Sequence, residues 1–354
     1  MSALALKSDA VNPVARRPRV LIVDDSSVAR AVIERIVSDS GRFDVAAALP
    51  DAPTALSWLA SERADILLLD IDMPGIDGLT ALPDLIEAGG DARIIVVSSS
   101  AHDGQSASIQ ALALGAADTL VKPVAGSLAG HFSRTLIERL SRLVDAGEGN
   151  DAVIVDALPA KPFGQIDLLA IGASTGGIHA LGQLLRALPR SFDAPILITQ
   201  HLPATFMPYF AAQVAVLAGR PCEVAVDCMR IRPGRAIIAP GDAHVRVVKT
   251  SDGASIRLDR ERAASGCMPS VDPMFESVAQ VFGGRACGVV LSGMGRDGLE
   301  GARILSRSGG AVVAQDKATS VVWGMPGAVA QAGIARAVLP PDVIGRLLAT
   351  GLSL

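Results

Sequence analysis

Two patterns of apolar and polar residues follow each other along residues 18–144, and they predict strands and helices in turn. Continuous apolar runs with polar ends are typical of buried parallel strands, and they occur in VLIVDD, DILLLDIDMPGIDG, ARIIVVSSS and DTLVKPV. Between them, SSVARAVIERIVSDS has helical spacing with Ser26 or Ser27 as its N-cap, and Gly115 ends the helix SASIQALALGA. This order predicts an α/β domain, a doubly wound parallel sheet with helices on both faces.

Residues 165–354 show a similar alternation. The predicted strands are IDLLAIG, ILITQH, ACGVVLSGMGRDG and GAVVAQD. From Cys222 to Asp259, short β-prone runs are broken by PG, GD and DG turns, which predicts antiparallel hairpins. We therefore expect a second mostly parallel α/β domain with a β-ribbon insertion. Residues 145–164 are polar and contain glycine and proline, which predicts a linker.

Composition narrows the class of protein. Half of the 354 residues are hydrophobic, which excludes general disorder, while a net charge of −4 and 3% aromatic residues argue against nucleic-acid binding. No apolar stretch approaches the roughly 18 residues of a membrane span. Residues 1–17 lack the features of a signal peptide and are expected to be a disordered lead-in. We expect a soluble, cytoplasmic monomer that is not inserted in a membrane.

The cysteine pattern indicates no metal centre. No CxxC pair occurs and no His/Cys cluster has zinc-binding spacing. We interpret all of them as buried free thiols in a reducing compartment; they are Cys222, Cys228, Cys267 and Cys287.

Acidic residues end two predicted strands of the first domain. Asp24 and Asp25 follow VLIV, Asp70 ends DILLLD, Ser98 follows IIVV and Lys122 precedes a proline. The carboxyl ends of parallel strands line one crevice, so these side chains should converge there. Crowded carboxylates suit Mg²⁺, and a lysine and a hydroxyl can stabilise extra negative charge, such as that of an acyl phosphate.

A candidate nucleophile follows the first strand of the second domain. Gly172 to Gly176 fit GxSxG, which holds Ser174 in a sharp turn between strand and helix. His201 and Asp297 also follow apolar strands, so all three should meet in one crevice as nucleophile, base and orienting acid. Alternatively, His201 only begins a helix and Asp297 only forms a turn.

A nucleotide-binding site is a second alternative. GMGRDG supplies Gly293, Gly295 and Gly298 in a GxGxxG pattern between a strand and a helix, and Asp316 ends the next strand. This pattern fits a dehydrogenase. However, the fingerprint usually opens its domain, whereas here it comes late, and it leaves Ser174 without a role.

Taken together, the acidic residues, Ser98 and Lys122 closely resemble the response-regulator receiver domain, which has a flavodoxin-like fold, over residues 18–144. The resemblance implies that Asp70 is the phospho-acceptor. It also implies that Asp25, Asp70 and the backbone carbonyl of Asp72 bind Mg²⁺, with support from Asp24.

In the same family, the residues that match Ser98 and Lys122 contact the phosphoryl group. Thr119 departs from the pattern, because receivers usually carry Tyr or Phe three residues before this lysine. How activation is relayed from the pocket therefore stays open.

The second domain resembles the catalytic domain of the chemotaxis protein-glutamate methylesterases, through GASTGG, QHLPATF, RPGRAIIAPGDAH, MPSVDPMF, LSGMGRDG and AQDKATSVVWGMP in that order. The resemblance implies a Rossmann-like serine esterase with the triad Ser174, His201 and Asp297. Its substrates would be glutamyl methyl esters, with methanol released, and certain glutamines of chemoreceptors.

A chemotaxis histidine kinase would supply the activating phosphate, and the esterase step needs no cofactor. Backbone N–H groups near Met294 and Thr175 are our candidates for the oxyanion hole. A non-enzymatic regulator that only docks on receptors is the remaining alternative.

Overall fold

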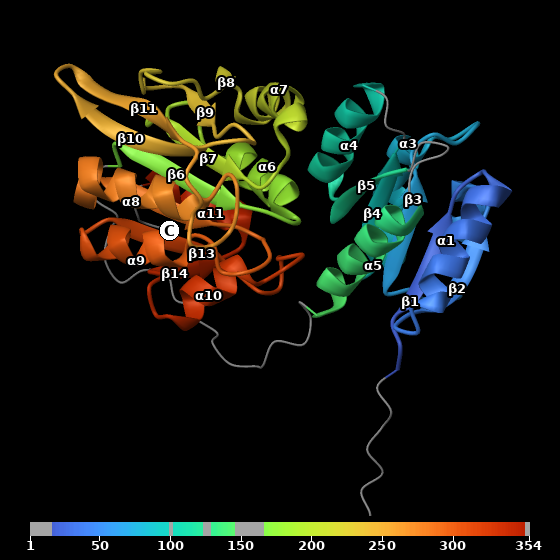
Figure 1. Ribbon diagram of the computed structural model, residues 1–354. Coiled ribbons are helices and arrows are strands. Elements are labelled where there is room, and N and C mark those ends of the chain that lie inside the picture. The colour runs from blue at the N-terminus through green and yellow to red at the C-terminus, as the bar shows by residue number, and fades with distance from the viewer. Residues whose placement is uncertain (1–15, 99–101, 123–128, 146–165, 351–354) are drawn as a thin grey trace, which may run out of the picture.

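The computed structural model describes residues 16–98, 102–122, 129–145 and 166–350, which form two α/β domains lying side by side (Figure 1). Most of the expected N-terminal lead-in and nearly all of the expected linker lie outside these residues. Within them, no helix has the length and apolarity that a bilayer crossing requires.

The N-terminal domain is built on a parallel sheet with the order β2-β1-β3-β4-β5. Its strands are β1 (Arg19–Val23), β2 (Asp44–Leu49), β3 (Ile66–Asp70), β4 (Arg93–Ser98) and β5 (Asp118–Val121). Its helices are α1 (Ser27–Asp39), α2 (Ala52–Leu59), α3 (Gly78–Gly89), α4 (His102–Leu114) and α5 (Ala129–Asp145). Ser26 caps α1 by accepting a hydrogen bond from Ala29 N, which confirms one of the two predicted caps.

The C-terminal domain has a parallel sheet in the order β14-β13-β12-β6-β7-β9-β8. Its strands are β6 (Leu168–Ala173), β7 (Ile196–Gln200), β8 (Cys222–Val224), β9 (Ala236–Ile238), β12 (Ala286–Val290), β13 (Ala311–Gln315) and β14 (Ala337–Leu339). Its α-helices are α6 (Gly177–Ala187), α7 (Met207–Ala218), α8 (Val271–Phe282), α9 (Leu299–Arg307), α10 (Met325–Gln331) and α11 (Pro341–Thr350). Two 3₁₀ turns complete it, η1 (Ala204–Phe206) and η2 (Gly283–Arg285).

The insertion is smaller than the sequence predicted. Among the described residues, only β10 (His244–Thr250) and β11 (Gly253–Asp259) form an antiparallel hairpin. The prediction of hairpins is confirmed for this pair but was wrong for the segment from Cys222 to Ile238, where β8 pairs with β9 in parallel and extends the main sheet. The segment between β8 and β9 is too long for a tight turn, so the chain crosses back and enters the sheet in the same direction.

β6 is fixed from both faces of its sheet. Leu168 and Ala170 pack on one face into a cluster with Phe275 of α8, whereas Leu169 and Ile171 pack on the other face with Leu181 of α6. All four strand residues are fully buried. The end of β6, where the candidate nucleophile begins, is therefore held by packing from above and below.

The two domains are in direct contact. Helix α4 packs against α6 and α7, and the hydrophobic cluster on this side is continuous between the domains (Figure 1). Gly176 N donates to Ala117 O at 3.2 Å, and His179 Nδ1 donates to Ala113 O at 3.3 Å. The N-terminal domain therefore sits beside the loop that carries Ser174.

Candidate active site

Ser174 lies in the turn between β6 and α6, where close packing excludes larger residues. A Cβ atom on Gly172 would lie 2.5 Å from Val271 Cγ1, and one on Gly176 would lie 2.4 Å from Val321 Cβ. Gly176 also has φ 73°, in the left-handed region, and caps the start of α6. The glycines around Ser174 are thus required by contacts and by backbone conformation.

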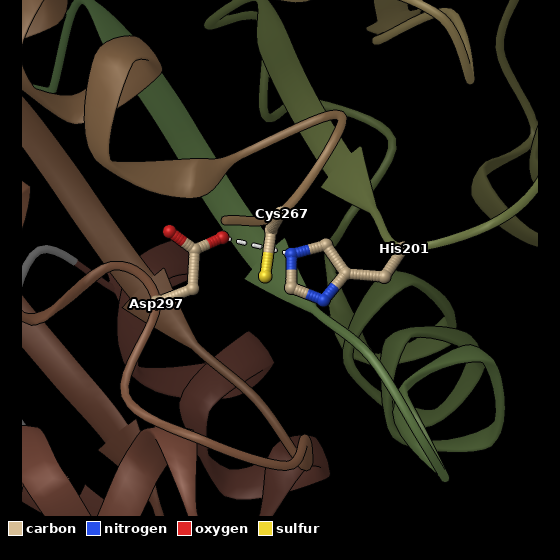
Figure 2. A group of neighbouring side chains, drawn as sticks. All are labelled: His201, Cys267 and Asp297. Carbon is tan, nitrogen blue, oxygen red and sulfur yellow. Dashed lines mark hydrogen bonds and ion pairs between the residues drawn. The ribbon is translucent and has the colours of Figure 1, made fainter. Parts of the chain in front are cut away.

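His201 follows β7, the neighbour of β6. Its backbone N–H donates to Ala173 O at 3.2 Å, which keeps the residue beside the Ser174 turn. Its ring Nε2 lies 2.8 Å from Asp297 Oδ2, and because a carboxylate only accepts, Nε2 carries the proton. The other ring nitrogen, Nδ1, points away from Asp297 (Figure 2).

Asp297 follows β12, the neighbour of β6 on its other side, and is held by three donors. Besides His201, Ser270 Oγ donates to Oδ1 at 2.6 Å and Val271 N donates to Oδ2 at 2.8 Å. The side chain is only 1% exposed. Burial raises the pKa of this carboxyl, but the hydrogen bond and charge of His201, together with Ser270 and Val271, lower it to about 2.

The pairing with Asp297 also shifts the pKa of His201. Burial lowers the pKa of His201, but the hydrogen bond that its ring donates to Asp297 and the nearby Cys267 raise it to about 9. Asp297 therefore stabilises the imidazolium form, as an orienting acid must do when the histidine takes up a proton.

His244, which is buried, belongs to the same hydrogen-bond network. His244 Nε2 donates to Glu261 O at 2.8 Å, and its Nδ1 accepts from Ser270 N at 2.8 Å. Ser270 is fully buried, so its backbone and hydroxyl connect the base of the β-ribbon to Asp297. No pattern in the sequence indicates this role of Ser270.

A cavity of about 360 Å³ joins the candidate residues. Ser174 and His201 both line it, although no hydrogen bond links their side chains in the described part of the chain. Thr175 and Met294 also line it, and their backbone N–H groups donate to no acceptor among the described residues. Free donors beside a serine and a histidine suit the stabilisation of an oxyanion.

The loop with the GxGxxG pattern packs directly on the serine turn. A Cβ on Gly293 would lie 2.4 Å from Met325 Sδ and 2.9 Å from Ser174 Cβ. Gly298, with φ 88°, is the N-cap of α9 and directly follows Asp297. These contacts favour the serine site over the nucleotide site, because they use the glycines for packing and for placing Asp297.

The cysteine prediction needs correction. Cys287 is buried, but Cys228 is exposed and Cys222 and Cys267 are half-buried. The sequence also suggested no His/Cys cluster, whereas ligand atoms of His201, Cys267 and Asp297 lie within 4.8 Å of one another (Figure 2). Spacing along the chain could not reveal this group, since its members come from three distant loops.

The acidic residues of the N-terminal domain also converge. Lys122 Nζ lies 2.9 Å from Asp24 Oδ2 and 2.7 Å from Asp70 Oδ2. Burial raises the pKa of Asp70, and Lys122 opposes this shift. Carboxylate oxygens of Asp24, Asp25 and Asp70 lie within 4.8 Å of one another, and an all-oxygen donor set of this kind fits Mg²⁺.

Three further predicted residues lie around this pocket. Ser98 ends β4, is buried, and has its Oγ 3.0 Å from Ser108 Oγ. Asp72 N donates to Asp70 Oδ1 at 3.2 Å. Thr119 lies on β5, beside Val96 of β4.

Residues of the N-terminal domain cover part of the serine cavity. Besides the residues around Ser174, its lining includes Leu112, Ala117, Asp118, Arg139 and Arg142. The cavity thus lies between the two domains, with residues of both in its lining.

Comparisons with known proteins cover both domains. The family model for the CheB methylesterase matches residues 169–348, and that for the response regulator receiver domain matches residues 20–128. The protein-glutamate methylesterase/protein-glutamine glutaminase 2 of Caulobacter vibrioides is 42% identical, over 94% of this chain and 98% of its own. The corresponding Maricaulis maris protein is 36% identical, over 96% of each chain. The crystal structure of the Thermotoga maritima CheB methylesterase catalytic domain is 33% identical with a TM-score of 0.51, covering 53% of this chain and all of its own.

Replacing Asp297 tests the electrostatics of the pair. In Asp297→Asn the carboxylate charge is lost while burial remains, so the pKa of His201 should fall well below 9. NMR titration of the ring in labelled protein measures this pKa. Asp342→Asn, on the outer helix α11, should leave it unchanged, and a value near 9 in Asp297→Asn would contradict the assigned cause.

Proposed function

Because the chain belongs to the CheB methylesterase family and carries a receiver domain in front, we propose that Ser174, His201 and Asp297 form its catalytic triad. The chain is a protein-glutamate methylesterase and protein-glutamine glutaminase whose receiver domain places it under control by phosphorylation. The main support for this triad is the 2.8 Å distance between His201 Nε2 and Asp297 Oδ2, beside the cavity that Ser174 lines.

In this mechanism Ser174 Oγ attacks the side-chain carbonyl of a methylated glutamate. His201 accepts the hydroxyl proton at Nδ1, since Nε2 is held by Asp297, and returns the proton to the leaving methoxide, which departs as methanol. Water then hydrolyses the acyl-enzyme to glutamate. The deamidation of glutamine follows the same steps with ammonia as the leaving group.

The tetrahedral intermediate needs donors for its oxyanion. The backbone N–H groups of Thr175 and Met294 are our candidates, because they line the cavity without an acceptor of their own among the described residues. In known sites, each such donor contributes about 3–4 kcal/mol to stabilising the transition state.

Regulation begins at the acidic pocket of the receiver domain. We propose Asp70 as phospho-acceptor, with Ser98 and Lys122 as contacts for the phosphoryl group. Mg²⁺ would be held by Asp25, Asp70 and the Asp72 carbonyl, with Asp24 in support, and it would neutralise charge during phosphoryl transfer.

The partners follow from the family. The proposed substrates are glutamyl methyl esters and glutamines on the cytoplasmic helices of chemoreceptors, and the proposed phosphodonor is a chemotaxis histidine kinase. Action as a cytoplasmic monomer fits these partners. We propose residues 18–144 as the receiver domain and 165–354 as the catalytic domain.

Removing the hydroxyl of Ser174 should abolish the reaction but preserve the fold. Ser174→Ala should lose ester hydrolysis by several orders of magnitude, because the nucleophile is gone. Methanol release from methylated receptor membranes measures the rate, and thermal melting checks the fold. Ser308→Ala, which changes an exposed serine beyond α9, should remain active; methanol release by Ser174→Ala would show another nucleophile.

The receiver domain should restrain the enzyme. Residues 160–354 alone should demethylate faster than unphosphorylated full-length protein, by roughly 5–150-fold for typical coupling energies, because residues such as Arg139 no longer cover the cavity. Asp70→Asn should keep the basal demethylation rate, but acetyl phosphate should not increase that rate. A slower isolated domain, together with no effect of a phosphodonor, would contradict inhibition by covering.

Activity should rise with pH across the neutral range. His201 must be neutral to accept a proton, and since its pKa is raised to about 9, the neutral fraction grows as pH increases towards that value. Methanol release from pH 6 to 10, with the Ser174→Ala background subtracted, measures the profile. A rate that is already maximal at pH 7 would mean that the working base titrates lower.

A further inference from the structure

Two residues of the proposed triad belong to a group of side chains that ester hydrolysis does not use as a whole. We call His201, Cys267 and Asp297 the His–Cys–Asp cluster. One ligand atom from each residue lies within 4.8 Å of the other two, and Figure 2 shows the sulfur between the imidazole and the carboxylate. The hydrolytic mechanism gives Cys267 no role.

The donor atoms of the cluster suit a particular metal ion. An imidazole nitrogen, a thiolate and a carboxylate oxygen are the ligands that Zn²⁺ takes in proteins, and such three-ligand sites leave a fourth position to water. The acidic pocket of the receiver domain differs, because it offers only oxygen atoms and so suits Mg²⁺.

The distances within the cluster also fit a metal ion. His201 Nε2 and Asp297 Oδ2 lie 2.8 Å apart with one proton between them. Two tetrahedral ligands at about 2.0 Å from Zn²⁺ lie roughly 3.3 Å apart, so the pair must open only by a few tenths of an ångström. Cys267 is half-buried and lines the cavity, so water can supply the fourth ligand.

Outer contacts already orient the carboxylate. Ser270 Oγ and Val271 N donate to Asp297, and both can remain in place when a metal replaces the proton from His201. Partners of this kind fix the direction of metal ligands and raise metal affinity.

We propose that the His–Cys–Asp cluster is a Zn²⁺ site that inhibits the enzyme. Binding displaces the proton between His201 Nε2 and Asp297 from the imidazolium form, together with the proton of the Cys267 thiol, and both protons pass to solvent. The neutral ring then holds the metal at Nε2 and keeps its remaining proton on Nδ1, so His201 cannot accept the proton of Ser174. The inhibition rests on the proposed triad, whereas the binding does not.

Co²⁺ tests the binding alone, because a thiolate bound to Co²⁺ gives an intense near-ultraviolet charge-transfer absorption. The full-length protein is titrated in saturating Mg²⁺, which occupies the receiver's acidic pocket. We expect this absorption to saturate at one Co²⁺ per chain and to disappear on addition of Zn²⁺. Cys267→Ser should abolish it, whereas Cys228→Ser, at an exposed cysteine outside the cluster, should retain it. Circular dichroism confirms that both variants fold.

Zn²⁺ then tests the inhibition. Each variant's methanol release is divided by its own rate with a chelator present. Wild type and Cys228→Ser should lose activity in Zn²⁺ and recover it with chelator. Cys267→Ser should need at least about tenfold more Zn²⁺, since even outer-shell changes weaken metal sites by roughly 10–100-fold.

The Co²⁺ and Zn²⁺ experiments test the metal site and its inhibitory role separately. Absence of the thiolate absorption in wild type, or its survival in Cys267→Ser, overturns the metal site whatever the esterase activity. If Co²⁺ binds as expected but Zn²⁺ leaves methanol release unchanged, the inhibitory role is overturned. A chain that binds Co²⁺ but hydrolyses no ester supports the metal site and contradicts the proposed function.

Discussion

The hydrogen bond between His201 Nε2 and Asp297 Oδ2 spans the middle of the C-terminal sheet. Strand β6 lies between β12 and β7 in this sheet. The hydrogen bond joins the loop after β12 to the loop after β7, and Ser174 follows β6. Asp297 is buried and the side chain of His201 is 17% exposed, and removing one partner of a buried pair typically costs about 3–5 kcal/mol because the other charge loses its compensation. The fold must therefore keep these two loops together, and doing so places both beside Ser174.

The network around Asp297 explains why the β-ribbon matters to the site. Asp297 accepts from Ser270 and Val271, and Ser270 N donates to His244, which begins β10. A carboxylate held by several donors cannot rotate freely, so it fixes both the direction and the proton position of the His201 ring. The insertion is thus part of the support of the site, although it contributes no residue to the proposed triad.

The sequence predicted the parts of the site that depend on strand ends. Ser174, His201 and Asp297 each follow an apolar run, and parallel strands bring their carboxyl ends to one edge, so their convergence needed no knowledge of loops. Cys267 and Ser270 lie in a loop before α8 with no periodicity, and only tertiary packing brings them to Asp297.

Strand direction in the insertion was missed for a related reason. β8 and β9 are three residues each, so their alternation carries little information, and the turn residues before β9 suggested a hairpin. Their orientation is set by the buried sheet, where Ile196 of β7 pairs with Ala236 of β9. Local turn signals cannot report this pairing, because it joins segments far apart in the chain.

The short strand β5 connects the two sites physically. At its end, Lys122 contacts Asp24 and Asp70, while just before its start Ala117 O accepts from Gly176 N beside the Ser174 turn. Four strand residues extend about 13 Å, so the acidic pocket and the serine cavity are separated by one rigid element. Thr119 on this strand lacks an aromatic ring that could change rotamer. β5 and the contacts of Ala117 therefore form one physical connection between the acidic pocket and the serine cavity, beside the packing of α4 against α6 and α7.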